Sequence, residues 1–282
     1  MTLKEQLLQI KQNSPSIISN KLLFEMVENI GSLDSELRDT LIYSLFSDWT
    51  TTGKLSVNQE QKVSSFLLDN SYLLQNIDNK NDKLSIFTRS FAALFLASLS
   101  YRHNNHSFLS QSQQRQIIEQ SIDYIQNEHD FRGLTNDGWA HGIAHIADLL
   151  DEVVDFTTFT HNDSILVINA IKNILHNSFL FTADEPGRMV VPVLHLINKN
   201  IISDDELNNW ITLLNDLKVD NFNAYSNVSL FMIKLQAHLL IAYPDSNKLV
   251  SLVNCTIKQN YQQSIAQLNK ITSVSNIYNQ IL

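Results

Sequence analysis

The side chains best suited to catalysis or ligand binding concentrate in residues 132–152, RGLTNDGWAHGIAHIADLLDE. Apolar residues recur there at three- and four-residue steps, which predicts a helix over 137–156. One polar stripe of such a helix would carry His141, His145, Asp148 and Glu152. A histidine beside a carboxylate can transfer protons or bind a polar ligand, so we place the candidate functional site on this helix.

The spacing of His141 and His145 also suggests a metal ion. At positions i and i+4 of a helix both imidazoles can reach one divalent ion, but a zinc site needs three or four protein ligands. The sequence HGIAH has no glutamate in the place where zinc proteases of the HExxH type carry their general base. We therefore predict no cofactor, with a divalent metal at these two histidines as the alternative.

Arginines near this segment could bring positive charge to it. Arg89 lies in the apolar stretch TRSFAALFLASL, so we expect it to be buried and to need a carboxylate or a phosphate-like partner. Arg132 precedes the free backbone N–H groups that begin the predicted helix, a combination suited to an anion. We expect Arg89 or Arg132 to pair with Asp148, Asp151 or Glu152. The full set of ligand-binding candidates is His141, His145, Asp148, Arg132, Arg89, Arg188, Trp139 and Glu152.

Three functions are compatible with this set of residues. The first, which we favour, is a binding or scaffold protein that recognises a small anionic ligand or a peptide. The second is an enzyme of the hydrolase or lyase type, with His141 or His145 as general base and Asp148 orienting it. The third is a purely structural polar network that fixes helix packing. The sequence leaves open whether the protein is an enzyme, and it does not predict an oligomeric state.

Helical signals run through the whole chain. Only six glycines and four prolines are present, and a β-rich chain would need many more tight turns. Capping boxes are predicted at Ser56 with Gln59, Ser110 with Gln113, Thr182 with Glu185, and Ser203 with Glu206. We predict helices over 2–12, 20–30, 34–49, 57–68, 71–77, 82–102, 111–127, 137–156, 163–177, 184–199, 204–217, 227–242 and 246–280.

So many helices cannot share the core of one bundle. The linkers between them are short and polar, which makes successive helices antiparallel neighbours. Helical hairpins that stack and bury each other's faces would satisfy both conditions. We predict an all-α fold and one domain over 1–282, a degenerate HEAT-like helical-repeat solenoid (an α/α superhelix), with a closed α/α toroid as the alternative.

Composition excludes several classes of partner. The net charge of −9 argues against nucleic acid, which needs a basic surface, and against an anionic membrane surface. Cys255 is the single cysteine, so neither an internal disulfide nor a cysteine-rich zinc cluster can form. The first residues lack the apolar core of a signal peptide, and SFAALFLASLSY is too short to span a bilayer. We expect a cytoplasmic protein.

Three segments resemble a bacterial family catalogued as domain of unknown function 2785. They are TRSFAALFLASL (88–99), FRGLTNDGWAHGIAHIADLLDEV (131–153) and DEPGRMVVPVLHLI (184–197). The residues that carry the resemblance are Arg89, Ser90, Phe91, Arg132, Gly133, Gly138, Trp139, His141, His145, Asp148, Asp151, Glu185 and Arg188. The third segment departs from the family pattern, because Pro186 and Gly187 separate the acidic residue from Arg188. The resemblance implies membership of the family but no activity.

Overall fold

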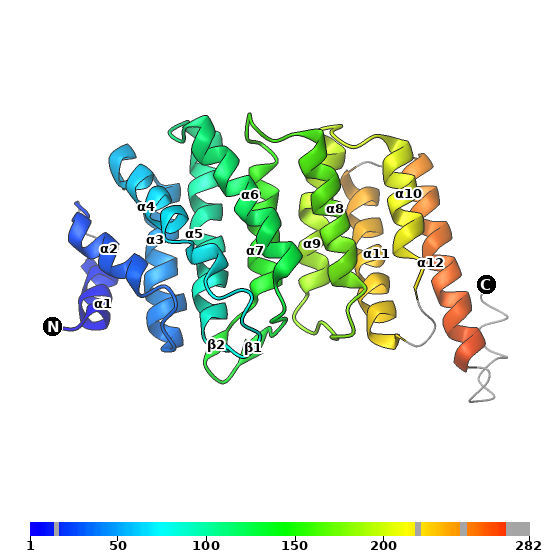
Figure 1. Cartoon of the computed structure of the whole chain (residues 1–282), viewed down its shortest axis with the longest axis horizontal. Coiled ribbons are helices and arrows are strands. Elements are labelled where there is room, and N and C mark those ends of the chain that lie inside the picture. Colours follow the sequence, from blue (N-terminus) through cyan, green and yellow to red (C-terminus); the bar gives the residue numbers. More distant parts are fainter. Residues whose placement is uncertain (14–16, 218–220, 243–246, 269–282) are drawn as a thin grey trace. The chain divides into compact units, whose positions relative to one another are not determined.

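The computed structural model describes residues 1–13, 17–217, 221–242 and 247–268, and the chain there is mostly helical (Figure 1). The predicted all-α class is confirmed, and none of the described helices combines the length and apolar character that a membrane span requires. The helices are α1 (Leu3–Asn13), α2 (Asn20–Glu28), the π-helix η1 (Glu36–Tyr43), α3 (Ser44–Thr51), α4 (Val57–Asp69), the 3-10 helix η2 (Tyr72–Leu74), α5 (Ser85–Asn105), α6 (Gln111–Asn127), α7 (Gly142–Val153), α8 (His161–Leu175), α9 (Glu185–Asn198), α10 (Asp204–Leu214), α11 (Phe222–Ala242) and α12 (Asn247–Leu268). One short hairpin, β1 (Leu134–Thr135) with β2 (Gly138–Trp139), interrupts them.

The chain divides into two compact units. Unit 1 consists of residues Met1–Ile174 and Phe181–Ile201, and it contains every candidate site residue. Unit 2 consists of Leu175–Leu180 and Ile202–Leu282. Within unit 2, Trp210 of α10 packs edge-on against Phe231 of α11, with ring centroids 5.8 Å apart. Side chains of α11 and the residue before it also hold the 176–179 segment: Asn221, Asn223 and Asn227 donate to the carbonyls of His176, Ser178 and Phe179.

In unit 1, α3, α5, α7 and α9 run in the same direction, with α5 between α3 and α7, and α7 between α5 and α9. For each pair of neighbouring helices in this row, the contact nearer the N-terminal end of one helix is also the contact nearer the N-terminal end of the other. A second row is formed by α4, α6 and α8, which polar side chains connect. The contacts within the first row are Phe46–Phe95 and Ser47–Ser98, Ser90–His145 and Asn104–Glu152, and Asp148–Arg188 and Asp151–His195. Those within the second row are Gln113–Ser65 and Arg115–Asp163.

Helix α5 is the centre of unit 1. From Ser85 to Ser100 every residue except Thr88 is buried. A helix that is apolar around its whole circumference has to be covered on all sides, which fits this position between two neighbours and behind a second row. A buried polar side chain between Ser85 and Ser100 therefore lies in the core and needs a partner there.

Three of the four predicted capping boxes are confirmed, at Ser56, Ser110 and Ser203. The fourth prediction, Thr182 with Glu185, is wrong. Helix α9 instead begins after Asp184, which has a left-handed backbone with φ of 64°. The Glu185 carboxylate turns back and accepts from the backbone N–H of Ala183 at 3.0 Å.

Candidate functional site

The predicted helix over 137–156 begins later than expected, because residues 134–139 form a hairpin and α7 starts at Gly142. Leu134 pairs with Trp139, and Thr135 pairs with Gly138. Gly138 has φ of +89°, and a Cβ there would lie 2.6 Å from the Cβ of Ser35, so this position requires glycine. The Asp-Gly dipeptide at 137–138 was the local signal for this turn, and the apolar periodicity obscured it.

Arg38, which the sequence analysis did not single out, holds this hairpin in place. Its side chain is fully buried on η1, with the guanidinium 4.4 Å above the ring of Phe87. One nitrogen, Nη2, donates to the carbonyls of Asp137 at 2.9 Å and Trp139 at 3.3 Å. The Nε lies 2.8 Å from the carboxylate of Asp39, which balances the charge. The hairpin is thus fixed from η1, an element about a hundred residues earlier in the chain.

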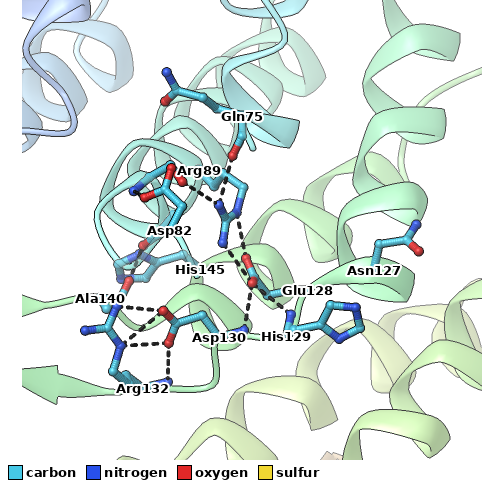
Figure 2. A network of polar contacts seen from close by, with 12 residues as sticks. Gln75, Asp82, Arg89, Asn127, Glu128, His129, Asp130, Arg132, Ala140 and His145 are labelled. Carbon is cyan, nitrogen blue, oxygen red and sulfur yellow. Dashed lines mark hydrogen bonds and ion pairs between the residues drawn. The ribbon is translucent and has the colours of Figure 1, made fainter. Parts of the chain in front are cut away.

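Arg89 is buried and ion-paired, as predicted, but its partner is Glu128 at the end of α6 (Figure 2). The prediction of Asp148, Asp151 or Glu152 is wrong. Nε donates to Oε2 of Glu128 at 2.8 Å and Nη2 donates to Oε1 at 2.9 Å, while the two side chains are 3% and 1% exposed. Nη1 donates to the carbonyl of Gln75. This guanidinium therefore belongs to the packing of unit 1 and has no N–H directed at a ligand.

Arg132 is neutralised in the same way by its neighbour Asp130 (Figure 2). Nε donates to Oδ1 of Asp130 at 2.8 Å, and Nη2 donates to the carbonyl of Lys83 at 2.7 Å. Together with the backbone N–H of Asp130, which donates to Glu128 at 2.8 Å, these bonds tie the loop between α6 and the hairpin to the start of α5. The carboxylate of Asp130 thus occupies the position at Arg132 where the sequence predicted an anion.

His145 is held by Ser90 of α5 in one tautomer. The Ser90 hydroxyl donates its only proton to the carbonyl of Ala140, and its oxygen lies 2.6 Å from Nδ1 of His145. Nδ1 must therefore be the donor, which leaves Nε2 unprotonated with its lone pair free. Burial, together with the charges of His141 and Arg188, lowers the pKa of His145 well below its usual range. The residue is 9% exposed, and within the described residues Nε2 has no hydrogen-bond partner.

His141 precedes α7 in a left-handed conformation, with φ of 50°, so the predicted single helical stripe for both histidines is wrong. Packing still brings the two rings together, with centroids 5.5 Å apart. Nε2 of His141 donates to the carbonyl of Ala183 at 3.0 Å, and it lies 3.5 Å from Oε1 of Glu185 on α9. The His141 ring also stacks on Trp139, which is 40% exposed, with ring centroids 4.8 Å apart.

These histidines belong to a continuous aromatic row across α5. Tyr43 contacts Phe91 edge-on at 6.1 Å, and Phe91 contacts His145 edge-on at 5.4 Å. The His145, His141 and Trp139 rings continue the row to the hairpin. Phe91 in this row is only 2% exposed, whereas Trp139 at the end of the row is open to solvent.

Asp148 pairs with Arg188 of α9 at the edge of this row. Nε of Arg188 donates to Oδ1 of Asp148 at 3.0 Å, and Nη2 contacts Oδ2. Burial raises the pKa of Asp148, although its bond to Arg188 opposes that shift. The Arg188 side chain is 44% exposed, and Nη1 does not take part in the pair. Of the three arginines proposed from the sequence, Arg188 is the one with an N–H edge left for solvent or a ligand.

Glu152 lies apart from the histidines, seven residues after His145 and about 10 Å further along α7. Its Oε2 accepts a hydrogen bond from Asn104 of α5 at 3.1 Å. Burial and the charges of Asp151 and Asp155 raise the pKa of Glu152 to about 7. The predicted polar stripe is therefore divided between a site near His145 and Arg188 and a separate acidic cluster near Glu152.

Surface depressions of about 460 and 430 Å³ lie elsewhere in unit 1, the first along α2 and α4 and the second along α6 and α8. Neither is lined by a candidate residue. In the part of the chain that the structure describes, no three histidine, cysteine, aspartate or glutamate side chains are arranged to hold a metal ion. The groups at this site that a ligand could bind are therefore the free lone pair of His145 and the unpaired N–H groups of Arg188.

Comparison with known proteins gives one match. The model of a family described as "Protein of unknown function (DUF2785)" matches residues 73–240, which include the whole row from α5 to α9 and all the candidate site residues. Searches of curated proteins and of solved structures find nothing that matches the chain.

Proposed function

We propose that this chain, which belongs to the family described as "Protein of unknown function (DUF2785)", is a binding protein on a HEAT-like helical-repeat solenoid. The repeat arrangement is supported by unit 1, where α3, α5, α7 and α9 run in one direction and α4, α6 and α8 form a second row. Stacked helical pairs of this kind bury a continuous core and leave one row available for partners.

Nε2 of His145 is the observation that carries the binding function. This nitrogen has no partner among the described residues and is not one of the fully buried polar atoms without a hydrogen bond, so solvent, or a ligand in place of solvent, can reach its lone pair. The bond from His145 to Ser90 fixes the ring and keeps its lone pair available at neutral pH. A ligand with an N–H or O–H donor would satisfy this nitrogen.

The charges around the site narrow the ligand class. Arg89 and Arg132 are neutralised by Glu128 and Asp130, so they add no positive charge for an anion. Arg188 offers Nη1, which its pairing with Asp148 leaves unused. We propose a small ligand with an anionic group for Arg188, a hydrogen-bond donor for His145 and an apolar part that rests on Trp139, the exposed end of the aromatic row. Hydroxy acids, amino acids and peptide carboxyl termini have this chemistry.

Calorimetric titration with a panel of such compounds tests the proposal, with acetate and phosphate as anions that lack an apolar part. His145→Asn keeps an amide donor close to Nδ1 and has no atom at the place of Nε2, whereas His145→Gln offers an acceptor there. We expect a compound that binds the wild type to bind His145→Asn at least about tenfold more weakly, a loss of about 1.4 kcal/mol in binding free energy. The loss of affinity in His145→Gln should be smaller than in His145→Asn. Arg115→Gln breaks a comparable arginine–aspartate pair far from the site and should leave binding unchanged. Absence of binding across the panel, or equal binding by His145→Asn, would disprove the proposal.

An acid–base enzyme is the second candidate, because one observation specifically favours it. A neutral imidazole with a fixed tautomer and a free lone pair is the state that a general base requires. Ser90, rather than the predicted Asp148, orients the ring. Product formation from a bound panel compound, followed by proton NMR and abolished in His145→Asn, would support catalysis over simple binding.

A further inference from the structure

A second cluster of ionisable groups joins α7 to α9 beyond the candidate site. Nδ1 of His195 lies 2.9 Å from Oδ1 of Asp151, and Nε2 of the same ring lies 3.4 Å from Oδ1 of Asp155. Lys199 contacts Asp155 as well. An imidazole placed between two carboxylates can donate to both only when both of its nitrogens are protonated. The geometry therefore favours the imidazolium form of His195.

Glu152 extends this cluster to α5. Its backbone carbonyl and its Oε2 both accept from the side chain of Asn104, at 2.9 and 3.1 Å. The charges that act on Glu152 are those of Asp151 and Asp155 on its own segment and of His195 on α9. Asp151 and Asp155 carry the same sign of charge as an ionised Glu152 and repel it. The cluster therefore favours the neutral form of Glu152.

Glu152 and His195 bind their protons more tightly in the folded chain than in the unfolded one. The bond to Asp151 raises the pKa of His195, with further contributions from the charge of Asp155, against the opposing effects of burial and Lys199. The pKa of Glu152 is raised to about 7 by burial first and then by Asp151. With both protons bound, Asp151 and Asp155 are balanced by His195 and Lys199, and Glu152 is neutral. Loss of both protons leaves two uncompensated negative charges between the helices.

We infer that Asp151, Glu152, Asp155 and His195 form a proton-controlled latch, which fastens α9 and α5 to α7 in mildly acid solution and loosens as the pH rises through neutrality. Glu152 on α7 and His195 on α9 have different partners, and both release their protons as the pH rises. The latch does not depend on the ligand proposed above. It does act on the same pair of helices, since Asp148 and Arg188 join α7 to α9 nearer their N-terminal ends.

Hydrogen exchange of the wild-type protein at pH 6.0 and pH 8.5, corrected for the intrinsic rates of the amides, tests this inference. An opening reaction that releases one proton becomes about tenfold more favourable for each unit of pH within the titration range. We expect amides of α9 to lose about tenfold or more of their protection between these pH values, relative to amides of α4 in the same unit. Equal changes in α9 and α4 would overturn the inference.

Two variants separate the contributions. Glu152→Gln is neutral at every pH, so it should retain more α9 protection than the wild type, and this excess should be larger at pH 8.5 than at pH 6.0. His195→Gln cannot become charged, so it should lose α9 protection at pH 6.0 and resemble the wild type at pH 8.5. Glu119→Gln, which removes an exposed carboxylate on α6, is the control and should behave as the wild type. The same pH dependence in all four proteins would show that these residues form no latch.

Discussion

The buried pair of Arg89 and Glu128 makes a strong prediction for Glu128→Gln. The carboxylate accepts two bonds from Arg89, and its Oε1 also accepts from the backbone N–H groups of His129 and Asp130 at 2.9 and 2.8 Å. A carboxamide keeps one oxygen for these backbone groups, but it removes the charge that balances a guanidinium only 3% exposed. The perturbation therefore isolates the ion pair from the loop that surrounds it.

Loss of one partner from a buried ion pair costs about 3–5 kcal/mol, because the other charge remains buried without compensation. Arg89 keeps its bonds to the Gln75 carbonyl and the Ser85 hydroxyl, which places our estimate at the lower end, about 3 kcal/mol. A domain has a total stability of about 5–15 kcal/mol, so this loss is a large part of it. In the double variant Arg89→Met with Glu128→Gln no charge remains unpaired, and we expect at least about 1 kcal/mol to be recovered.

Urea unfolding followed by tryptophan fluorescence measures this effect. In a Trp210→Phe background the remaining indoles are Trp49 and Trp139, and both belong to unit 1. The control is Asp34→Asn, which breaks the exposed pair with Lys4, side chains 43% and 32% exposed, and should cost about 0–1 kcal/mol. If Glu128→Gln is no more destabilising than Asp34→Asn, our account of how Arg89 is neutralised is wrong.

Three further predictions concern other parts of the molecule. Gly142→Ala should destabilise unit 1 by about 1–3 kcal/mol in urea unfolding, because its Cβ would lie 2.6 Å from the Tyr124 hydroxyl; an unchanged midpoint would contradict the close packing. Burial lowers the pKa of His103, whose Nδ1 accepts two backbone N–H bonds, so its contribution to stability is present above pH 6.5 and is lost as the pH falls below that value. Melting temperatures of the wild type and of His103→Gln from pH 7 to pH 5 check this, and parallel curves would refute it. Ser203→Ala should weaken unit 2 by about 1 kcal/mol through loss of the cap on α10, seen as faster hydrogen exchange in that helix and no change in α4.

Local signals in the sequence predicted most of the helices correctly. Serine caps followed three residues later by glutamine or glutamate mark the starts of α4, α6 and α10, because the bonds involved join residues within one turn. The apolar run around Arg89 correctly predicted a buried helix. The hairpin before α7 was missed, although the Asp-Gly dipeptide was visible, because three- and four-residue spacing extended through it by coincidence.

The need of Arg89 for a carboxylate follows from the sequence, since a guanidinium in an apolar helix cannot be buried alone. The identity of that carboxylate does not, because Glu128 is 39 residues away and reaches Arg89 only after α6 has packed beside α5. In the same way, the histidines were recognised by their spacing, but their different roles depend on Ser90 and Ala183, which α7 meets only in the folded protein. Residues within one turn select each other through backbone geometry alone, whereas partners on separate helices are selected by the packing of whole elements, which no short stretch of sequence contains.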